Sequence, residues 1–478
     1  MATRDPASPF RIAVVGAGIA GMAAAHRLVE LSRERNVPLD LSVWEAGRRP
    51  GGSIGTERTD GFVIESGPDS FISEKPAALQ LCERIGLTPR LVRTRDENRR
   101  TYVVHGGRLH ALPDGFLLLA PTQFWPLLTT RLFTWPGKLR MGLDLVLPRG
   151  AQRSDESLGS FVTRRLGREA LERVAQPLVG GIYTADPDDL SLAATMPRFL
   201  EMERKHRSVI LAMWRAIRQQ PATARATSGA RWSLFVSVDD GMQTLVDTLA
   251  QRLPEGVLRC GAPLTSVARE SDRWRLRLGD GATAEVDALL LATPAHQSSS
   301  LLRDIDRELA QELTGIPYAS SATVSLAYPI SAFPHPLDGF GFVVPLVESR
   351  GLVACTYSSM KYPGRAPEGF VLLRAFVGGA LQSERFEDDD ATMETRIRQE
   401  LADLLGVTSA PVLTRIHRHY QAMPQYRVGH LDRMARIDAR LATIGRLALA
   451  GNAYRGVGIP DCIRTGEQAA EALLDRSS

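Results

Sequence analysis

The first strongly apolar segments of the chain follow the order strand, glycine turn, helix, strand. Arg11–Val15 is a short β-branched run that predicts a buried strand, and it passes directly into the glycine-rich segment Gly16–Gly21. A helix is expected next, and a second strand is predicted over Leu39–Trp44, directly before the acid Glu45. This order predicts a βαβ unit whose helix N-terminus, at the glycine turn, is a site for an anion.

Apolar runs much further along the chain complete a doubly wound parallel sheet. Ala288–Leu291 is a continuous apolar run typical of a central parallel strand. Strands are also predicted at Leu264–Val267 and Trp274–Leu278, and Leu447–Leu449 precedes a glycine-rich loop and a helix that reaches Leu474. The fold class predicted is therefore α/β, with a Rossmann-type domain assembled from separated segments.

Between residues 301 and 433 the pattern changes to alternating short strands and loops, which predicts a mixed α+β domain that roofs a substrate pocket. Helices are predicted over Ser157–Leu171 and Ser208–Gln220, and a loop over Pro221–Gly229. The candidate strands are Ala322–Tyr328, Gly341–Val344, Gly351–Tyr357 and Gly369–Phe376.

Residues 115–147 are dominated by leucine and aromatic residues, with interspersed arginine and lysine and a single acid, Asp144. Prolines 121, 126 and 136 divide the segment into pieces too short to cross a bilayer. Short helices that lie in a membrane interface fit this composition. A lining for an apolar substrate route and a core-facing helical bundle are the alternatives.

Composition limits the function classes. At 478 residues the chain is too long for one core, and its formal net charge of +4 suits an anionic substrate or membrane surface rather than nucleic acid. The four cysteines show no CxxC pair and no metal-ligand spacing, so we expect free thiols and no metal site. Met1–Pro9 lacks a signal-peptide pattern, which predicts a cytoplasmic protein.

The first glycine turn carries the GxGxxG pattern of dinucleotide-binding proteins. Gly16 permits the tight turn, Gly18 lets a pyrophosphate approach the backbone, and Gly21 lets the helix pack closely on the strand. Glu45 is placed to accept hydrogen bonds from an adenosine ribose. An ordinary glycine-rich βα turn is the alternative. The expected dinucleotide contacts are Gly16, Ala17, Gly18, Ile19, Ala20, Gly21, Glu45 and Ala46.

A second glycine turn, Gly47–Thr56, resembles the RxGGxxxT signature of the flavin amine oxidases. Gly52 and Ser53 let the backbone pass close beneath a diphosphate, and the Arg49 guanidinium neutralises it. A surface turn with chance arginines is the alternative. The resemblance implies one noncovalently held FAD per chain.

Further segments resemble one group within that family, the oxygen-dependent protoporphyrinogen oxidases, and the similarity runs from about residue 10 to 476. By this resemblance Gly181 lies near the reacting ring, Tyr357 stacks on a pyrrole ring, and the backbone of Val267 contacts adenine. A helix stop at Gly181 and a core tyrosine at 357 are the alternatives. The remaining flavin contacts implied are Gly67, Pro68, Asp69 and Ser70 in a GPxS turn, and Val457, Gly458 and Ile459 at the start of the last helix.

The resemblance implies oxidation of protoporphyrinogen IX to protoporphyrin IX in haem biosynthesis, with O2 as acceptor and H2O2 released. Arg100, beside the position where the family binds a propionate, is the candidate clamp, with a solvated loop as the alternative. The rival functions are coproporphyrinogen III oxidation, a flavin amine oxidase or carotenoid desaturase reaction, and a non-enzymatic membrane-peripheral protein that keeps FAD as a structural element.

The expected organisation has three parts. An FAD-binding domain comprises residues 1–84, 232–299 and 434–478, a substrate-binding domain comprises 85–112, 205–231 and 300–433, and residues 113–204 form a helical, membrane-associating insertion. We therefore expect peripheral association with the cytoplasmic membrane and no nucleic-acid partner. Assembly into a homodimer is left open.

Overall fold

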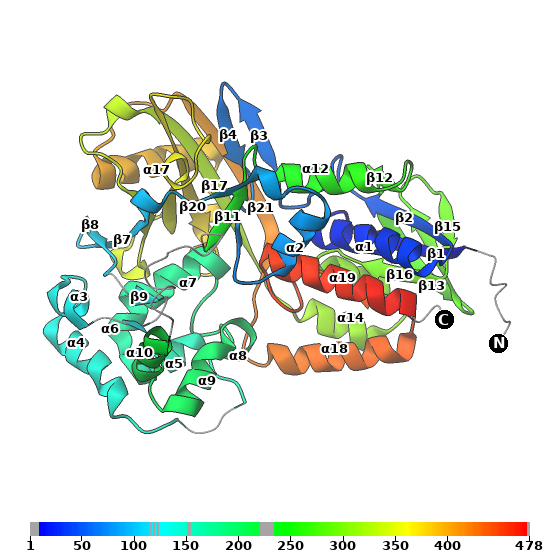
Figure 1. Cartoon of the computed structure of the whole chain (residues 1–478), viewed down its shortest axis with the longest axis horizontal. Coiled ribbons are helices and arrows are strands. Elements are labelled where there is room, and N and C mark those ends of the chain that lie inside the picture. Colours follow the sequence, from blue (N-terminus) through cyan, green and yellow to red (C-terminus); the bar gives the residue numbers. More distant parts are fainter. Residues whose placement is uncertain are drawn as a thin grey trace.

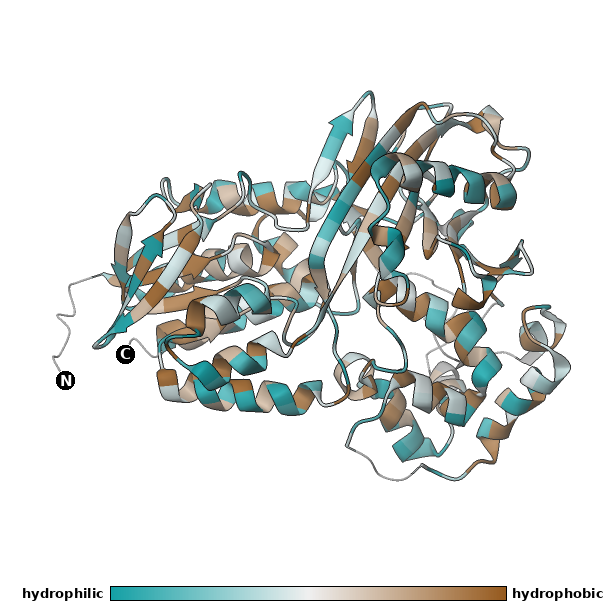
Figure 2. Ribbon diagram, turned by 180° about the vertical axis from the view of Figure 1, so that it is seen from behind, coloured by the Kyte–Doolittle hydropathy of each residue, from teal (hydrophilic) through white to brown (hydrophobic). Residues whose placement is uncertain are grey.

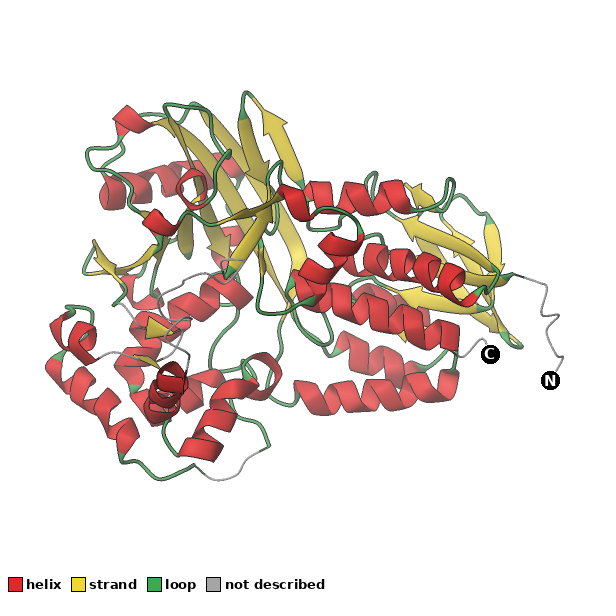
Figure 3. Cartoon of the chain, in the orientation of Figure 1, coloured by secondary structure: helices red, strands yellow, loops and turns green. Residues whose placement is uncertain are grey.

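The computed structural model describes residues 9–113, 116–117, 120–121, 124–150, 154–219 and 234–475. The described residues form three parts, shown in the same orientation in Figures 1 and 3. A parallel sheet with its helices lies at the right, a large mixed sheet lies at the upper left, and a group of helices lies below the mixed sheet. The expected loop Pro221–Gly229 lies outside the described residues.

Five parallel strands form the first part, in the order β12-β2-β1-β16-β22. The strands predicted at both ends of the chain and at Ala288–Leu291 are confirmed, because all of them belong to this one sheet. The strand bounds are β1 (Phe10–Val15), β2 (Leu39–Glu45), β12 (Leu258–Cys260), β16 (Ala288–Leu291) and β22 (Leu447–Leu449).

Side chains of β1 alternate between two hydrophobic cores. Ile12 and Val14 pack beneath one layer of helices, whereas Ala13 and Val15 pack against an antiparallel sheet and a second layer of helices. The first layer is α1 (Ile19–Arg35), α2 (Ala77–Arg84), α12 (Gln243–Arg252) and α19 (Ile459–Asp475). The second side consists of β13 (Leu264–Glu270), β14 (Arg273–Leu278), β15 (Thr283–Val286), α13 (Ala295–Leu302), α14 (Arg307–Thr314) and α18 (His430–Ile444).

The mixed sheet has seven strands in the order β21-β17-β20-β19-β18-β7-β8. One face is apolar and packs on helix α17 (Asp390–Leu405), whereas the other face carries the buried polar residues Thr323, Ser325 and Arg374. The strands are β7 (Arg100–His105), β8 (Arg108–Ala111), β17 (Tyr318–Pro329), β18 (Gly339–Val343), β19 (Ala354–Tyr357), β20 (Phe370–Gly378) and β21 (Leu413–Pro424), with short helices α15 (Ser358–Lys361) and α16 (Ser383–Phe386).

Short strands join the first two parts. They form a hairpin of β3 (Thr56–Thr59) and β4 (Phe62–Glu65), and a three-stranded sheet of β5 (Phe71–Ile72), β11 (Phe235–Val238) and β6 (Leu91–Arg93). The turn between β4 and β5 contains the predicted flavin contacts Gly67–Ser70.

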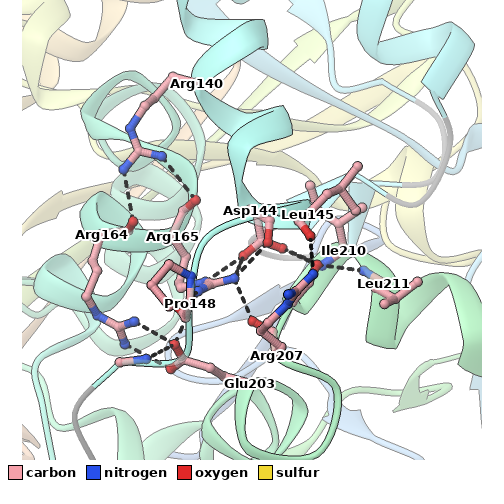
Figure 4. Close-up of polar contacts among 12 residues, drawn as sticks. Arg140, Asp144, Leu145, Pro148, Arg164, Arg165, Glu203, Arg207, Ile210 and Leu211 are labelled. Atoms are coloured by element: carbon pink, nitrogen blue, oxygen red, sulfur yellow. Dashed lines mark hydrogen bonds and ion pairs between the residues drawn. The ribbon is translucent and has the colours of Figure 1, made fainter.

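The helical part is held together by a buried charged network, drawn in Figure 4. The Arg165 guanidinium lies against the Asp144 carboxylate, and its Nη2 also donates to the Arg207 carbonyl at 2.7 Å. Asp144 in turn accepts hydrogen bonds from Ser208 Oγ at 2.6 Å and from the Ile210 amide at 3.0 Å. The helices are α3 (Phe124–Thr129), α4 (Trp135–Gly142), α5 (Leu158–Leu166), α6 (Arg168–Ala170), α7 (Gln176–Tyr183), α8 (Leu192–Thr195), α9 (Pro197–His206) and α10 (Val209–Gln219).

The structure differs from the sequence-based expectations at three places. Helix α10 shares its core with the other helices of this part, although residues 205–231 were expected in the substrate domain. The helix expected over Ser157–Leu171 is divided at Gly167, which has a φ of +95°, and a π-helical turn follows at Leu171–Ala175. Helix α7 continues through Gly181 to Tyr183, with Thr184 as its C-cap, so the alternative interpretation of Gly181 as a helix stop does not hold.

Candidate functional site

The first glycine turn joins β1 to α1, and the three glycines of its motif have different surroundings. A Cβ built on Gly16 would lie 2.8 Å from the Ala292 carbonyl oxygen, and one built on Gly21 would lie 1.9 Å from the Gly16 carbonyl oxygen. A Cβ on Gly18 would meet nothing within 4 Å. Two glycines are therefore required by packing, whereas Gly18 leaves open space at the N-terminus of α1, where the phosphates of a dinucleotide fit.

Glu45 ends β2 at this turn. Its carboxylate accepts hydrogen bonds from the Ala17 amide at 2.7 Å and from the Gly47 amide at 2.7 Å. The acid thus lies beside the glycine turn, and Ala46 next to it is exposed. The contact of Glu45 with a ribose stays a prediction. Val267 is buried on β13 in the neighbouring core, and its expected contact with adenine stays a prediction.

The second glycine turn lies directly against the first. The Gly51 amide donates to the Ala17 carbonyl at 2.8 Å, and a Cβ built on Gly52 would lie 3.4 Å from the Gly18 Cα. Arg49 donates to the Ile54 carbonyl at 2.6 Å and to Gln243 Oε1 at 2.8 Å, so in this structure its guanidinium braces the turn. Gly52 and Ser53 are exposed. The two glycine turns thus lie side by side and form one cradle at the N-terminus of α1.

The Gly67–Ser70 turn continues this surface. A Cβ on Gly67 would lie 1.7 Å from the Ser53 carbonyl oxygen, so the turn packs on the second glycine turn. The Asp69 carboxylate points into the protein, where it accepts hydrogen bonds from Ser70 Oγ at 2.7 Å and Lys361 Nζ at 3.1 Å. Burial alone would raise the pKa of Asp69, but Lys361 and Arg374 hold it well below its usual value. Asp69 is therefore ionised, and its carboxylate anchors the turn to Lys361.

The N-terminus of α19 meets the same surface. A Cβ on Gly466 would lie 2.2 Å from the Ala20 carbonyl oxygen, so α19 packs tightly on the first turn of α1. The helix begins at Ile459, directly after Val457 and Gly458, and Asp461 within its first turn pairs with Lys75 at 2.5 Å. The flavin contacts expected of these three residues stay a prediction. Burial raises the pKa of the nearby Cys462 thiol to about 12, which leaves little thiolate to attach a flavin covalently.

Helix α7 borders the other side of this loop. Gly181 is exposed, and a Cβ there would meet nothing within 4 Å, so the helix presents a face without a side chain at this point. Burial raises the pKa of Tyr183 to about 12, with a further contribution from Asp461, which places the tyrosine near the start of α19. Half-buried Leu178, Tyr183, Phe376 and Val457 pack against one hydrophobic cluster.

Two predicted substrate contacts lie elsewhere. The Tyr357 side chain is 2% exposed in the apolar core of the mixed sheet, where its ring packs edge-on against Phe342. Stacking on a macrocycle would require that core to open, so Tyr357 is a core residue in this structure. Arg100 is exposed and pairs with Asp338 at 2.7 Å, so its guanidinium is engaged at the surface; its role as a carboxylate clamp stays a prediction.

Sequence reasoning missed Phe376, Arg374 and His419. On β20, Arg374 and Phe376 are two residues apart and share the polar face of the sheet, and the Arg374 guanidinium lies 4.8 Å from the centre of the Phe376 ring. His419 lies on β21, two strands away. The period of two along β20, with Leu373, Ala375 and Val377 on the opposite face, is the signal that could have found the first two residues.

Comparison with known proteins agrees with this geometry. The family model for flavin-containing amine oxidoreductases matches residues 19–474. The chain is 34% identical to the coproporphyrinogen III oxidase of Bacillus subtilis over 97% of each chain, and 32% identical to the protoporphyrinogen oxidase of Homo sapiens over 97% of this chain and 98% of that one.

A solved structure from Exiguobacterium sp. 255-15, provisionally named a protoporphyrinogen oxidase, superposes with a TM-score of 0.86. The two are 32% identical, and the match covers 98% of this chain and all of the other. The glycine turns, the terminal acid of β2 and the helix N-terminus of α19 are thus found in a chain whose whole length matches flavoenzymes. The protein belongs to the flavin-containing amine oxidoreductase family and is an FAD-dependent oxidoreductase.

Proposed function

We propose that this enzyme oxidises protoporphyrinogen IX to protoporphyrin IX, with O2 as electron acceptor and H2O2 as the second product. The proposal rests above all on the open space at Gly181 of α7, whose near neighbour Tyr183 lies close to Asp461 at the start of α19, in a chain similar over its full length to porphyrinogen oxidases. A flat or puckered macrocycle requires such an unobstructed approach.

Bound FAD supplies the two-electron acceptor. The residues of the chain bind and orient the macrocycle and exclude water: Phe376, Leu178 and Val457 provide apolar surface, and Gly181 leaves space for the ring. Burial lowers the pKa of His419, which makes this histidine a neutral hydrogen-bond donor rather than an acid at neutral pH. The residues of the protein therefore position the macrocycle. The pyrrole N–H protons are released to solvent and not to a side-chain base.

Coproporphyrinogen III is the second candidate substrate. The bacterial relative of that name is 34% identical to this chain, slightly above the 32% of the human protoporphyrinogen oxidase. The two substrates differ in the number of carboxylates, four against two, and a four-carboxylate substrate requires a more basic and more open pocket.

Porphyrin fluorescence provides the test. FAD-loaded enzyme is supplied with each porphyrinogen at equal concentration under air, and the rate of porphyrin formation is recorded together with H2O2. We expect kcat/KM to be at least tenfold higher for protoporphyrinogen IX. The reverse preference would assign the coproporphyrinogen reaction, and a rate equal to spontaneous oxidation for both substrates would refute the proposal.

We further propose that the helical part associates with an anionic membrane surface through α3, α4 and the turn after α4. Trp135, Leu139 and Leu143 are spaced four residues apart along α4 and its extension, and all three are exposed. The other side of residues 115–147 belongs to the hydrophobic core of the helical part, because Leu127, Phe133 and Met141 are buried. Its one acid, Asp144, is buried against Arg165, so it puts no negative charge on this surface.

A hollow of about 450 Å³ adjoins this apolar stripe and supports the proposal. It is lined by Trp135, Leu128 and the basic residues Arg131, Lys138 and Arg173. Viewed from behind in Figure 2, the helices α3 and α4 form an outlying part of the molecule that is remote from the parallel sheet. No helix among the described residues is long and apolar enough to cross a bilayer, so the proposed contact is interfacial.

A further inference from the structure

Side chains from three adjacent strands of the mixed sheet converge on the backbone of the turn that links β4 to β5. Thr323 Oγ1 on β17 donates to the Ser66 carbonyl at 2.9 Å, and His419 Nε2 on β21 lies 2.7 Å from the same oxygen. Arg374 Nη2 on β20 donates to the Gly67 carbonyl. The sheet thereby holds the turn that is expected to border the flavin.

Burying the charged guanidinium of Arg374 costs free energy, and packing alone does not explain why the residue lies there. The residue is 4% exposed, and its Nε atom is buried without a hydrogen-bond partner. Two carboxylates act on the guanidinium, those of Asp69 and Glu65. They are paired with Lys361 at 3.1 Å and with Arg365 at 3.9 Å, so three cations face two anions behind the turn. Isolating a charge from water is unfavourable unless it is compensated, and the surplus here is positive.

We propose that Arg374 is a positioning residue for the flavin, which fixes the Ser66–Ser70 turn and places a buried positive charge behind it. A flavin gains negative charge when it is reduced, and a nearby fixed cation favours that state. Thr323 and His419 also fix the turn, but they place no positive charge behind it, because both are neutral hydrogen-bond donors. The inference requires FAD binding and does not depend on which porphyrinogen is the substrate.

Four variants of the full chain separate these tasks. Arg374→Met removes the donor and the charge, Arg374→Lys keeps the charge, and Thr323→Val removes one donor with little change of volume. Arg415→Met is the matched control. Arg415 lies on β21, on the same face of the mixed sheet as Arg374, but it pairs with Glu57 at the surface at 2.8 Å.

The measurements are the FAD dissociation constant, the midpoint potential of the bound flavin, and thermal unfolding of the FAD-free protein. For Arg374→Met we expect FAD binding at least tenfold weaker and a two-electron reduction constant at least tenfold smaller, which corresponds to a potential about 30 mV more negative. Arg374→Lys should bind FAD more weakly with a smaller change of potential. Thr323→Val should weaken binding and leave the potential unchanged, and Arg415→Met should change neither.

An Arg374→Met enzyme with the FAD affinity and midpoint potential of the wild type would overturn the proposal. If Arg374→Met fails to fold, the decision passes to Arg374→Lys and Thr323→Val, and wild-type values for both would overturn it equally. These measurements use no porphyrinogen. An enzyme that oxidises neither porphyrinogen would refute the proposed function, while the expected changes in FAD binding and potential would still support the role of Arg374.

Discussion

Single residues in the glycine motifs separate the requirements of the fold from those of the cofactor. Gly16 and Gly21 are enclosed by backbone atoms, whereas Gly18 has an ordinary φ of −64° and open space where a side chain would project. A side chain at Gly18 would therefore fill the cofactor cradle without straining the protein. Few substitutions offer so clear a separation between stability and binding.

Gly18→Val should yield a folded protein that does not retain FAD. We expect flavin absorbance to be lost from the purified variant while the far-ultraviolet circular dichroism matches that of FAD-free wild type. Gly142→Ala is the control, because Gly142 also has open surroundings and an ordinary φ of −60° but lies at the end of α4. Retention of stoichiometric FAD by Gly18→Val would contradict the assignment of the cradle.

Tyr357 and Phe376 are two aromatic residues whose roles the sequence could not tell apart. Tyr357→Ala should lower the free energy of unfolding by about 3–5 kcal/mol, because it leaves a cavity in the core. Phe376→Ala should instead raise KM by roughly ten- to a hundredfold, the equivalent of about 1–3 kcal/mol of lost ring contact. Denaturant unfolding and steady-state kinetics on both variants decide between the roles.

The hydroxyl of Tyr357 provides a further check. It is buried without a hydrogen-bond partner, and burial raises its pKa above the usual value, so it is a protonated group that gains nothing from its polarity. Tyr357→Phe should therefore equal or exceed the wild type in stability. Loss of turnover in Tyr357→Phe, with normal FAD content, would show that the hydroxyl takes part in the reaction.

At the scale of elements, the apolar stripe on α4 carries the membrane proposal. Replacing Trp135 and Leu139 by serine should weaken binding to vesicles containing anionic phospholipid at least tenfold. The reason is that each apolar side chain contributes about 1.5–3 kcal/mol of binding free energy when it is fully inserted, and serine does not. Co-sedimentation measures this. Ile330→Ser with Val412→Ser is the control, since both are exposed apolar residues of the mixed-sheet part. Wild-type protein that stays in the supernatant would refute the proposal.

Helix α9 contributes a pH-dependent anchor to the helical part. Burial alone would raise the pKa of Glu203, but hydrogen bonds from Arg164 and the Gly150 amide hold it below the ordinary value of 4.5. The folded pKa thus lies below the unfolded one, so this carboxylate stabilises the protein above about pH 4.5 and the contribution is lost as the pH falls through the folded pKa.

Glu203→Gln should accordingly lower the melting temperature at pH 7 and flatten its fall on acidification. Glu201→Gln on the same helix is the control, because the pair that Glu201 forms with Lys205 is exposed. Melting curves recorded between pH 7 and the acid limit of the fold provide the comparison. Parallel curves for Glu203→Gln and wild type would mean that the carboxylate is not an anchor.

Strands that are buried on both faces were predicted from the sequence more accurately than strands that are half-buried. Strands β1 and β16 were predicted to within one residue, because a strand covered on both faces is a continuous apolar run. Strand β21 was missed, since most of its residues are half-buried and its sequence, Leu413–Pro424, mixes arginine and histidine with apolar residues on both faces. The continuation of α7 through Gly181 was not predicted, because a glycine pair is common at the end of a helix; here the helix runs two residues further, to Tyr183.

For the whole molecule, the cofactor cradle was predictable and the substrate side was not. The cradle depends on backbone turns, whose glycines and terminal acid leave a local signature. The substrate side depends on which face of β20 a residue occupies and on how far α7 extends, and these follow from pairings between segments far apart in the chain. Resemblance alone placed Tyr357 in the pocket, whereas the pairing of Tyr357 with Leu373 puts it in the core.

The position of β22 at the edge of the parallel sheet has a consequence for biosynthesis. A ribosome delivers β1 early, but the edge strand that completes its sheet, β22, and the helix that packs on α1, α19, come from residues 447–475. A nascent chain thus exposes the unfinished cradle until α19 has left the exit tunnel, and we expect full affinity for flavin only from that point. Flavin supply would therefore act on chains that already contain residues 447–475, and chains that stop before them would be left to proteases without a ligand to protect them.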